Sequence, residues 1–189
     1  MKVEIVFILD ASGSMATVCS DAIGGFNSFL ADQKSVPGEA SMTLVLFNYN
    51  VTTLYDAVPL EDARALTVST YQPGGFTALL DAIGITFTNV GKRLEGLERK
   101  PDKVIVAILT DGQENASREY THKQVAEMIK HQQEKYSWEV IFLAANQDAF
   151  LVGESLNIKA DNTSNYVASK SGTRDAYQLM SNTVRGMRL

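Results

Sequence analysis

Residues 3–15, VEIVFILDASGSM, are the stretch that decides the fold. The first part, Val3–Leu9, is a nearly unbroken run of apolar and largely β-branched side chains. Such a run is typical of a strand buried on both faces, because a half-exposed strand would alternate apolar with polar residues. Asp10 follows directly, and a carboxylate there is costly unless it is paired, hydrogen-bonded or bound to a metal. We therefore expect a central strand with a polar site at its carboxyl end.

Further apolar segments predict the rest of the sheet. We expect strands at Met42–Phe47, Val51–Tyr55, Val104–Leu109 and Glu139–Ala144, and a weaker strand near Leu156–Ala160. Only Asn48–Asn50 separates the second strand from the third, and a connection this short permits only an antiparallel hairpin.

Segments with helical periodicity alternate with these strands. In a helix expected over Thr77–Glu98, apolar residues recur at intervals of three and four, at Leu80, Ile83, Phe87, Val90, Leu94 and Leu97. Further helices are expected over Val18–Lys34, Gln147–Glu154 and Thr173–Arg188. Thr121 and Gln124 match a capping box for a helix that ends near Tyr136. This alternation predicts an α/β fold, with a mostly parallel sheet and helices on both faces.

The composition is that of one folded domain over residues 1–189. Of the 189 residues, 45% are hydrophobic and 21% are charged, which excludes a disordered chain. No apolar run reaches the roughly 20 residues that a membrane span needs. The N-terminal stretch carries Glu4 and Asp10, which a signal peptide would not, and Cys19 is the only cysteine. We therefore expect a soluble cytoplasmic protein that is monomeric in isolation and has no membrane partner.

The net charge is −5, and the negative charge is concentrated in the first third of the chain. Residues 1–62 contain two basic residues, Lys2 and Lys34, and eight acidic ones. No basic run or arginine-rich stripe occurs anywhere, so the electrostatic signature of nucleic-acid binding is missing.

Oxygen-bearing side chains alternate in the loop after the first strand. Asp10, Ser12 and Ser14 form a D-x-S-x-S pattern in which alternate residues can point at one centre, and Gly13 permits a tight turn. One carboxylate and two hydroxyls suit a hard divalent cation: Mg²⁺ foremost, with Mn²⁺ or Ca²⁺ as alternatives. A zinc site is not expected, because Cys19 stands alone and the two histidines lie nine residues apart on one predicted helix.

Two later segments add candidate ligands to this loop. Asp111 follows the strand at Val104–Leu109 in the sequence LTDG, and Thr77 follows Gly74 and Gly75 at the expected helix start. In open α/β sheets, ligands bind beyond the carboxyl ends of the strands, where the strand order reverses. We therefore consider Asp10, Ser12, Ser14, Thr77 and Asp111 together as a candidate metal site.

The sequences DASGSM, GGFTALLDA and LTDG, in this order and at these separations, resemble the von Willebrand factor A domain family and its metal-ion-dependent adhesion site. The resemblance covers essentially the whole chain. It implies a three-layer Rossmann-like fold with one antiparallel edge strand. It also implies that Asp10, Ser12, Ser14 and Thr77 hold the metal, with Asp111 often acting through a water molecule. Family members mostly bind protein partners, and intracellular bacterial-type members often act beside AAA+ ATPases or in the assembly of larger complexes.

Residues near the candidate ligands have simpler interpretations. Glu114, Asn115 and Ser117 follow Asp111, and we expect them to be solvated loop residues rather than part of the rim of the site. Asp81 is expected on the helix surface or as an acceptor behind the ligands.

We expect a binding module rather than an enzyme. The metal would capture an Asp or Glu of a protein partner. The alternative is a phosphoryl-transfer enzyme or phospho-receiver on a similar sheet. A haloacid-type phosphatase needs a second aspartate two positions after the first, where this chain has Ser12, and a receiver needs clustered acids where Asp10 stands alone. No P-loop, G-x-G-x-x-G motif or Ser/His/Asp arrangement is present.

Overall fold

The protein, seen in a computed structural model that describes all residues Met1–Leu189, is built around one six-stranded sheet. The strands are β1 (Lys2–Asp10), β2 (Glu39–Phe47), β3 (Val51–Pro59), β4 (Lys103–Thr110), β5 (Glu139–Ala144) and β6 (Thr163–Asn165). Their order across the sheet is β3-β2-β1-β4-β5-β6. Only the edge pair of β2 and β3 is antiparallel, and all other pairs are parallel. The predicted α/β class, with its antiparallel edge strand, is confirmed.

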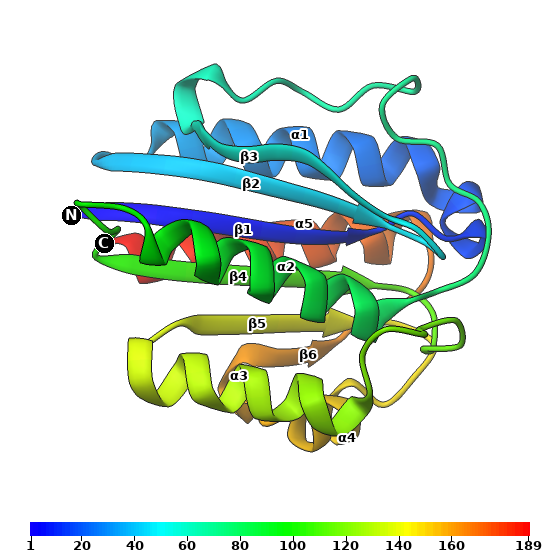
Figure 1. Cartoon of the computed structure of the whole chain (residues 1–189). Coiled ribbons are helices and arrows are strands. Elements are labelled where there is room, and N and C mark those ends of the chain that lie inside the picture. The colour runs from blue at the N-terminus through cyan, green and yellow to red at the C-terminus, as the bar shows by residue number, and fades with distance from the viewer.

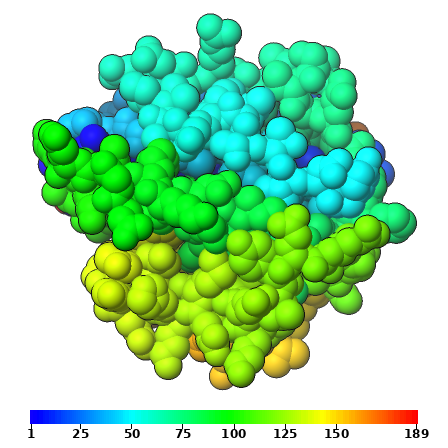
Figure 2. Space-filling model, in the orientation of Figure 1, coloured from blue at the N-terminus to red at the C-terminus, as the bar shows by residue number.

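Helices cover both faces of the sheet (Figure 1). They are α1 (Cys19–Ser35), α2 (Leu79–Glu95), α3 (His122–Tyr136), α4 (Ala149–Ser155) and α5 (Lys170–Arg188), with short 3₁₀ turns at Gly13–Val18, Leu60–Asp62 and Ala160–Asn162. Helices α1 and α5 lie together on one face, and α2 and α3 lie on the other (Figure 1). Figure 2 shows α2 and α3 covering the second face, with the side chains of β2 and β3 at the surface beside them.

The sheet separates two apolar cores, and the alternation of side chains in β1 supplies both. Ile5 and Phe7 belong to the core beneath α1 and α5, whereas Val6 and Ile8 belong to the core beneath α2 and α3. The ring of Phe7 packs edge-on against Phe29 with centroids 5.0 Å apart. This two-sided burial explains why the strand sequence is apolar at successive positions instead of at alternate ones.

The last strand is not where the sequence predicted it. The expected strand at Leu156–Ala160 is absent, and β6 is Thr163–Asn165. Leu156 and Ile158 are buried in the second core, but Asn157 between them has a left-handed φ of 60°, which no strand accommodates. The alternating apolar pattern therefore belongs to a turn, and its two apolar side chains pack in the second core.

Helices α1, α2, α4 and α5 have boundaries that differ from the prediction, and the largest differences are in α2 and α5. Helix α2 begins at Leu79 instead of Thr77 and ends at Glu95, where Gly96 forms its C-cap. Helix α5 begins at Lys170, ahead of the expected Thr173, because the Ser169 side chain caps it by accepting from the Gly172 N–H at 3.0 Å. The predicted capping box of α3 is present: Thr121 and Gln124 each accept a hydrogen bond from the other's backbone N–H.

The strand order reverses at β1, which places two loops side by side. The chain goes from β1 to β2 on one side and later enters β4 on the other, with Leu9 in register with Leu109. The loops that follow β1 and β4 therefore leave the same edge of the sheet, at the right-hand end in Figure 1. None of the helices combines the length and hydropathy that crossing a bilayer requires.

Candidate metal centre

Asp10, the first candidate ligand, is completely buried at the end of β1. Its Oδ1 accepts from the Ser12 N–H at 2.7 Å, and its Oδ2 accepts from the Thr110 hydroxyl at 2.6 Å and from the Asp111 N–H at 3.3 Å. These hydrogen bonds offset the free-energy cost of burying a charged group, and they fix the orientation of the carboxylate. Asp10 is thus part of the internal structure of the loop as well as a candidate ligand.

The two serines of the loop after β1 face the loop after β4, which begins at Asp111. Their hydroxyl oxygens, Ser12 Oγ and Ser14 Oγ, are 3.2 Å apart. Ser14 Oγ donates to Asp111 Oδ1 at 2.5 Å, so the side chains predicted from the loops after β1 and β4 do meet.

The Gly74-Gly75 turn, which precedes α2, is hydrogen-bonded through its backbone to the loop after β1. The Gly13 N–H donates to the Gly75 carbonyl and the Gly74 N–H donates to the Ala11 carbonyl, both at 2.9 Å. Gly75 has a φ of 76°, the left-handed conformation that glycine adopts without strain. This pairing of backbones holds the Gly-Gly turn beside the D-x-S-x-S loop and brings Thr77 to the site.

Thr77 has a buried side chain whose hydroxyl makes no hydrogen bond within the protein. A Cβ built on Gly112 would lie 3.2 Å from Thr77 Oγ1 and 3.8 Å from Ser14 Oγ, so both hydroxyls approach the same small residue. Thr77 precedes α2 by two residues and does not cap it; Ala78 occupies the N-cap position. The Thr77 hydroxyl was expected to be a cap or a ligand. It is not a cap, and it has no hydrogen-bond partner within the protein.

Asp111 is buried next to a second carboxylate. Burial raises the pKa of Asp111, and the charge of Asp10 raises it further, while the hydrogen bond from Ser14 opposes the rise. Two carboxylates close together in a buried site repel each other. A bound cation would relieve that repulsion and favour the charged form of Asp111.

Three residues after Asp111 accept hydrogen bonds from the start of α2, which the sequence did not predict. Glu114, Asn115 and Ser117 were expected to be solvated loop residues, but each accepts a hydrogen bond from a backbone N–H at the start of α2: those of Leu80, Thr77 and Asp81. The unpaired N–H groups of a helix start need such acceptors, which is the physical reason for the correction.

Asp81 adds further hydrogen bonds between α2 and the loop after β4. Its carboxylate accepts from the N–H groups of Arg118, Glu119 and Tyr120 at 2.8, 2.9 and 2.9 Å. Asp81 is an acceptor, one of the two roles expected for it, and it ties down the loop that carries Asp111.

Sequence reasoning missed three residues that shape the site. Thr110 orients Asp10 through its hydroxyl, and the Tyr71 hydroxyl donates to the Asp10 carbonyl at 2.6 Å. The ring of Tyr49 lies so close to Gly75 that a Cβ there would be 2.3 Å from Tyr49 Cδ1. Thr110 adjoins Asp111, and this adjacency was the only available signal. Tyr71 lies in a segment whose path across the sheet edge has no local sequence signature, and Tyr49 lies in the predicted Asn48–Asn50 turn but meets Gly75 only through the fold.

The donor set fits a hard divalent cation. Asp10, Ser12, Ser14, Thr77 and Asp111 supply only oxygen atoms, which Mg²⁺ and Ca²⁺ prefer. No three His, Cys, Asp or Glu side chains gather anywhere in a metal-binding arrangement, so the hydroxyls are indispensable to this set. The unbonded hydroxyl of Thr77 beside Ser14 is the feature that most favours a ligand at this position.

The sequence profile of the von Willebrand factor type A domain matches residues 4–179. The chain belongs to this family. Domains of the von Willebrand factor A (vWA) type commonly mediate protein–protein interactions. No curated protein sequence matches this vWA domain.

Two solved structures are similar to this vWA domain in fold. One is proximal thread matrix protein 1 of the mussel byssus, with a TM-score of 0.62 and 18% identity over 97% of this chain and 46% of that chain. The other is the von Willebrand factor type A protein from Catenulispora acidiphila, with a TM-score of 0.59 and 17% identity over 98% of this chain and 43% of that chain. Such identities show the fold alone. The chain spans less than half the length of either structure.

Proposed function

We propose that this vWA domain binds a divalent cation, most favourably Mg²⁺, and uses it to capture an acidic side chain of a partner protein. Asp10, Ser12, Ser14, Thr77 and Asp111 would hold the ion. The cation supplies a positive centre for a carboxylate. The residues of the chain position that centre and hold it at the edge of the sheet.

One observation carries the proposal. The Thr77 hydroxyl makes no hydrogen bond within the protein, although the residue is only 4% exposed, and it lies with Ser14 beside Gly112, where Asp111 accepts from Ser14. The lone pairs of the Thr77 hydroxyl are therefore available to a ligand. A divalent cation could accept lone pairs from both hydroxyls.

The charge balance of the donor set favours an added carboxylate. Only Asp10 and Asp111 carry formal charge, and Ser12, Ser14 and Thr77 are neutral. A divalent cation that keeps water at one open position can exchange it for an Asp or Glu oxygen, at about 2.0–2.1 Å for Mg²⁺. Such a short bond fixes the register of a complex.

The surface around the loops constrains the partner. The chain carries a net charge of −5, which disfavours a broadly acidic partner. Tyr49 and Phe76, from the loop after β2 and the loop before α2, are 58% and 67% exposed. A single carboxylate within a neutral or basic patch that also presents apolar side chains matches this surface.

A peptide selection tests the capture of a carboxylate. Displayed peptides would be selected on the immobilised protein in Mg²⁺ and eluted with EDTA. We expect the eluted peptides to share an Asp or Glu whose change to Asn or Gln weakens binding at least about tenfold. Peptides that bind equally well in EDTA, or that tolerate every such change, would show that partners use another face.

The remaining parts of the proposal concern its setting. We propose a non-enzymatic protein, monomeric in isolation, that acts in the cytoplasm without nucleic-acid or membrane partners. The family resemblance further suggests work beside an AAA+ ATPase or in the assembly of a larger complex. A neighbouring gene for such an ATPase would support that setting, and sedimentation of the purified chain would test the monomer.

A further inference from the structure

A cavity of about 300 Å³ lies between the last turns of α2 and α3, at the amino ends of β4 and β5. Figure 1 shows both helices ending at this edge of the sheet, opposite the metal centre. The walls are completed by the segment 100–104, which leads into β4, and by Trp138, which precedes β5. The volume is at the lower end of the range of about 300–1,000 Å³ typical of small-molecule sites. None of the candidate metal ligands lines this cavity.

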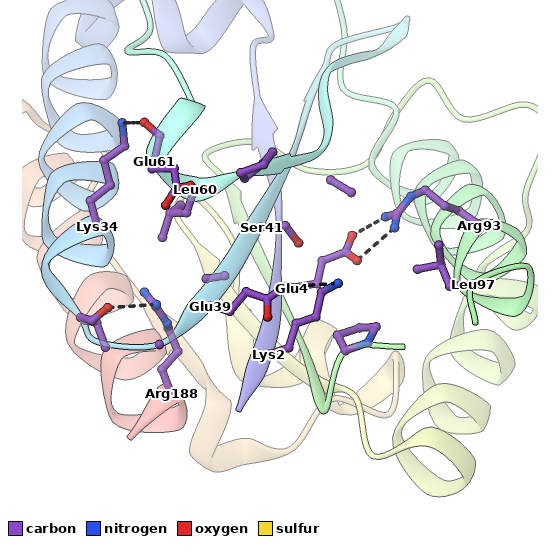
Figure 3. A pocket seen from close by; sticks show the side chains of 16 residues that line it. Lys2, Glu4, Lys34, Glu39, Ser41, Leu60, Glu61, Arg93, Leu97 and Arg188 are labelled. Atoms are coloured by element: carbon purple, nitrogen blue, oxygen red, sulfur yellow. Dashed lines mark hydrogen bonds and ion pairs between the residues drawn. The ribbon is translucent and has the colours of Figure 1, made fainter. Parts of the chain in front are cut away.

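A larger cavity, of about 610 Å³, lies next to it, and Pro101 lines both. Figure 3 shows Lys34 and Arg188 on the α1 and α5 side of the larger cavity and Arg93 and Leu97 on its α2 side. Its charged groups therefore do not meet at one point. The smaller cavity is better suited to hold a ligand, because one face of the sheet supplies the side chains that carry its chemistry.

A sharp turn after α3 brings Trp138 back beneath the helix. Ser137 has a left-handed φ of 54°, and the Trp138 backbone N–H donates to the Gln132 carbonyl at 3.1 Å. Such a turn is a common way for a helix to end. The Trp138 ring then packs against Phe87 of α2, with centroids 5.2 Å apart, in the core beneath α2 and α3. The backbone thus fixes the position of the indole in the wall of the cavity.

Trp138 presents an unpaired donor to the cavity. The residue is only 4% exposed, yet its indole N–H makes no hydrogen bond within the protein. The buried polar atoms that lack a partner belong to other residues, namely Thr86, Gln133, Tyr166 and Tyr177. The indole N–H therefore reaches solvent, and it does so through the cavity that Trp138 lines. Since an indole nitrogen only donates, its partner must be an acceptor.

Aromatic and apolar surface adjoins this donor. The rings of His131 and Tyr136 line the cavity and pack edge to face, with centroids 5.7 Å apart. Leu94 and Val104 are buried in the core beneath α2 and α3 and also line the cavity. A flat ring matches such a wall, because aromatic rings pack well both on one another and on aliphatic carbons.

The formal charges around the cavity balance. Lys103 Nζ donates to a carbonyl of α5 at 2.6 Å, and Asp102 Oδ2 accepts from a backbone N–H of β1 at 2.6 Å. Glu95 and Lys100 also line the cavity, have opposite signs and are exposed. An ion of either sign would thus gain no net attraction, which favours a neutral ligand.

We propose that this cavity binds a small neutral aromatic molecule with a carbonyl oxygen or a ring nitrogen as acceptor. The acceptor takes the hydrogen bond of the Trp138 indole, and the ring contacts Tyr136 and Leu94. The site shares no residue with the metal centre, so the two proposals stand or fall independently.

The test follows the indole N–H itself. The chain has one tryptophan, so this group gives a single cross-peak in a ¹H–¹⁵N NMR spectrum. Benzamide carries a ring and an acceptor, acetamide the acceptor alone, and benzene the ring alone; benzoate is the anionic counterpart. We expect benzamide to shift the cross-peak saturably, with a Kd of about 1 mM or tighter. Benzene and benzoate should each bind at least about threefold more weakly, and acetamide should give no saturable shift.

Substitution of Trp138 distinguishes a hydrogen-bond donor from a packing residue. Trp138→Phe removes the N–H and keeps an aromatic ring. In this variant, the backbone amides of Gly91 and Gln132 report binding. Affinity for benzamide should fall at least about threefold, and affinity for benzene should stay unchanged. A role in packing alone would weaken both probes alike.

A second substitution fills the cavity. Gly91 lines it, and a Cβ added there meets its nearest neighbour, Gln132 Nε2, at 3.8 Å. Gly91→Leu should weaken benzamide binding at least about tenfold, because the new side chain occupies the space of the ring. Gly186→Leu, the identical change at an exposed position of α5, is the matched control and should leave the affinity unchanged. Leucine favours helices more than glycine does, so both variants should fold.

Any of four results overturns the proposal. The first is the absence of a saturable shift with benzamide, and the second is binding of acetamide or benzoate as tight as that of benzamide. The third is a Trp138→Phe variant that binds benzamide as well as wild type or loses both probes alike. The fourth is equal affinity for benzamide in Gly91→Leu and Gly186→Leu.

Discussion

The Ser14 hydroxyl donates a 2.5 Å hydrogen bond to Oδ1 of Asp111, which lies 97 residues further along the chain. This bond joins the loop after β1 to the loop after β4, the two strands between which the sheet reverses its order. With a cation bound, the oxygen atoms of both side chains can face the ion, because the serine lone pairs are not used in this bond. The contact thus links the topology of the sheet to the chemistry of its edge.

The Thr77 hydroxyl provides the sharpest single-residue test of the metal site. Thr77→Val keeps the volume and branching of the side chain and removes only the oxygen. Since that oxygen bonds to nothing in the protein, the stability of the metal-free fold should change little. Mg²⁺ affinity should fall at least about tenfold, as ligand-shell substitutions commonly do. Isothermal calorimetry of Thr77→Val against Thr77→Ser, which retains the hydroxyl, distinguishes a ligand from a packing residue. Equal affinities in both variants would remove Thr77 from the ligand set.

Substitution of Asp10 should affect stability as well as metal binding. In the structure Asp10 is fully buried and accepts three hydrogen bonds. Asp10→Ala should therefore lower the free energy of unfolding by about 2–3 kcal/mol, since it leaves buried donors unsatisfied. Asp10→Asn keeps one acceptor and should cost about 1–2 kcal/mol. Urea denaturation without Mg²⁺ measures both, and an Asp10→Ala variant as stable as wild type would contradict this role.

Tyr71 should stabilise the first loop from behind. Its ring is buried and its hydroxyl donates to the Asp10 carbonyl at 2.6 Å. Tyr71→Phe removes this donor and keeps the ring, so the free energy of unfolding should fall by about 1–2 kcal/mol. Tyr55→Phe, which removes a 2.6 Å hydrogen bond to the exposed Arg64 carbonyl, is the control and should cost less. If the Tyr71 variant loses no more stability than the Tyr55 variant, the hydroxyl does not support the loop.

We expect no hydrolytic turnover from the metal-loaded protein. A phosphatase on this sheet would need a second acid near Asp10 to act on the leaving group, and Ser12 stands at that position. Incubation with p-nitrophenyl phosphate in Mg²⁺ or Mn²⁺ should release no more product than buffer. Hydrolysis that requires the metal and disappears in Asp10→Asn would instead establish the phosphoryl-transfer alternative.

Buried strands were the most predictable part of the fold. Runs such as Val3–Leu9 have an apolar pattern that requires two covered faces, and the observed β1 contains that whole run. The strand predicted at Leu156–Ala160 was wrong because its buried residues pack in a turn, and burial alone does not distinguish a turn from a strand. Some helices begin at other residues than predicted. This occurs where a cap such as Ser169, or a side chain distant in sequence, determines the first turn.

The candidate ligands were predictable, but the residues that support them were not. Asp10, Ser12 and Ser14 follow one strand in a recognisable pattern, and topology brings Asp111 beside them. Glu114 was assigned to solvent because its target, the Leu80 N–H, lies 34 residues earlier in the chain and becomes a neighbour only when α2 packs. Tyr71, 61 residues from Asp10, was missed for the same reason. Such long-range hydrogen bonds have no local sequence signal.

A calorimetric titration of Mg²⁺ and Mn²⁺ into the wild-type protein and into Asp10→Asn tests the central claim most directly. The account predicts one saturable site per chain in the wild-type protein. In a variant that remains folded by circular dichroism, it predicts affinity at least about tenfold weaker, because a charged ligand has become neutral. A wild-type protein that binds neither ion, or a folded Asp10→Asn variant that binds with unchanged affinity, would contradict the assignment of a metal to this site.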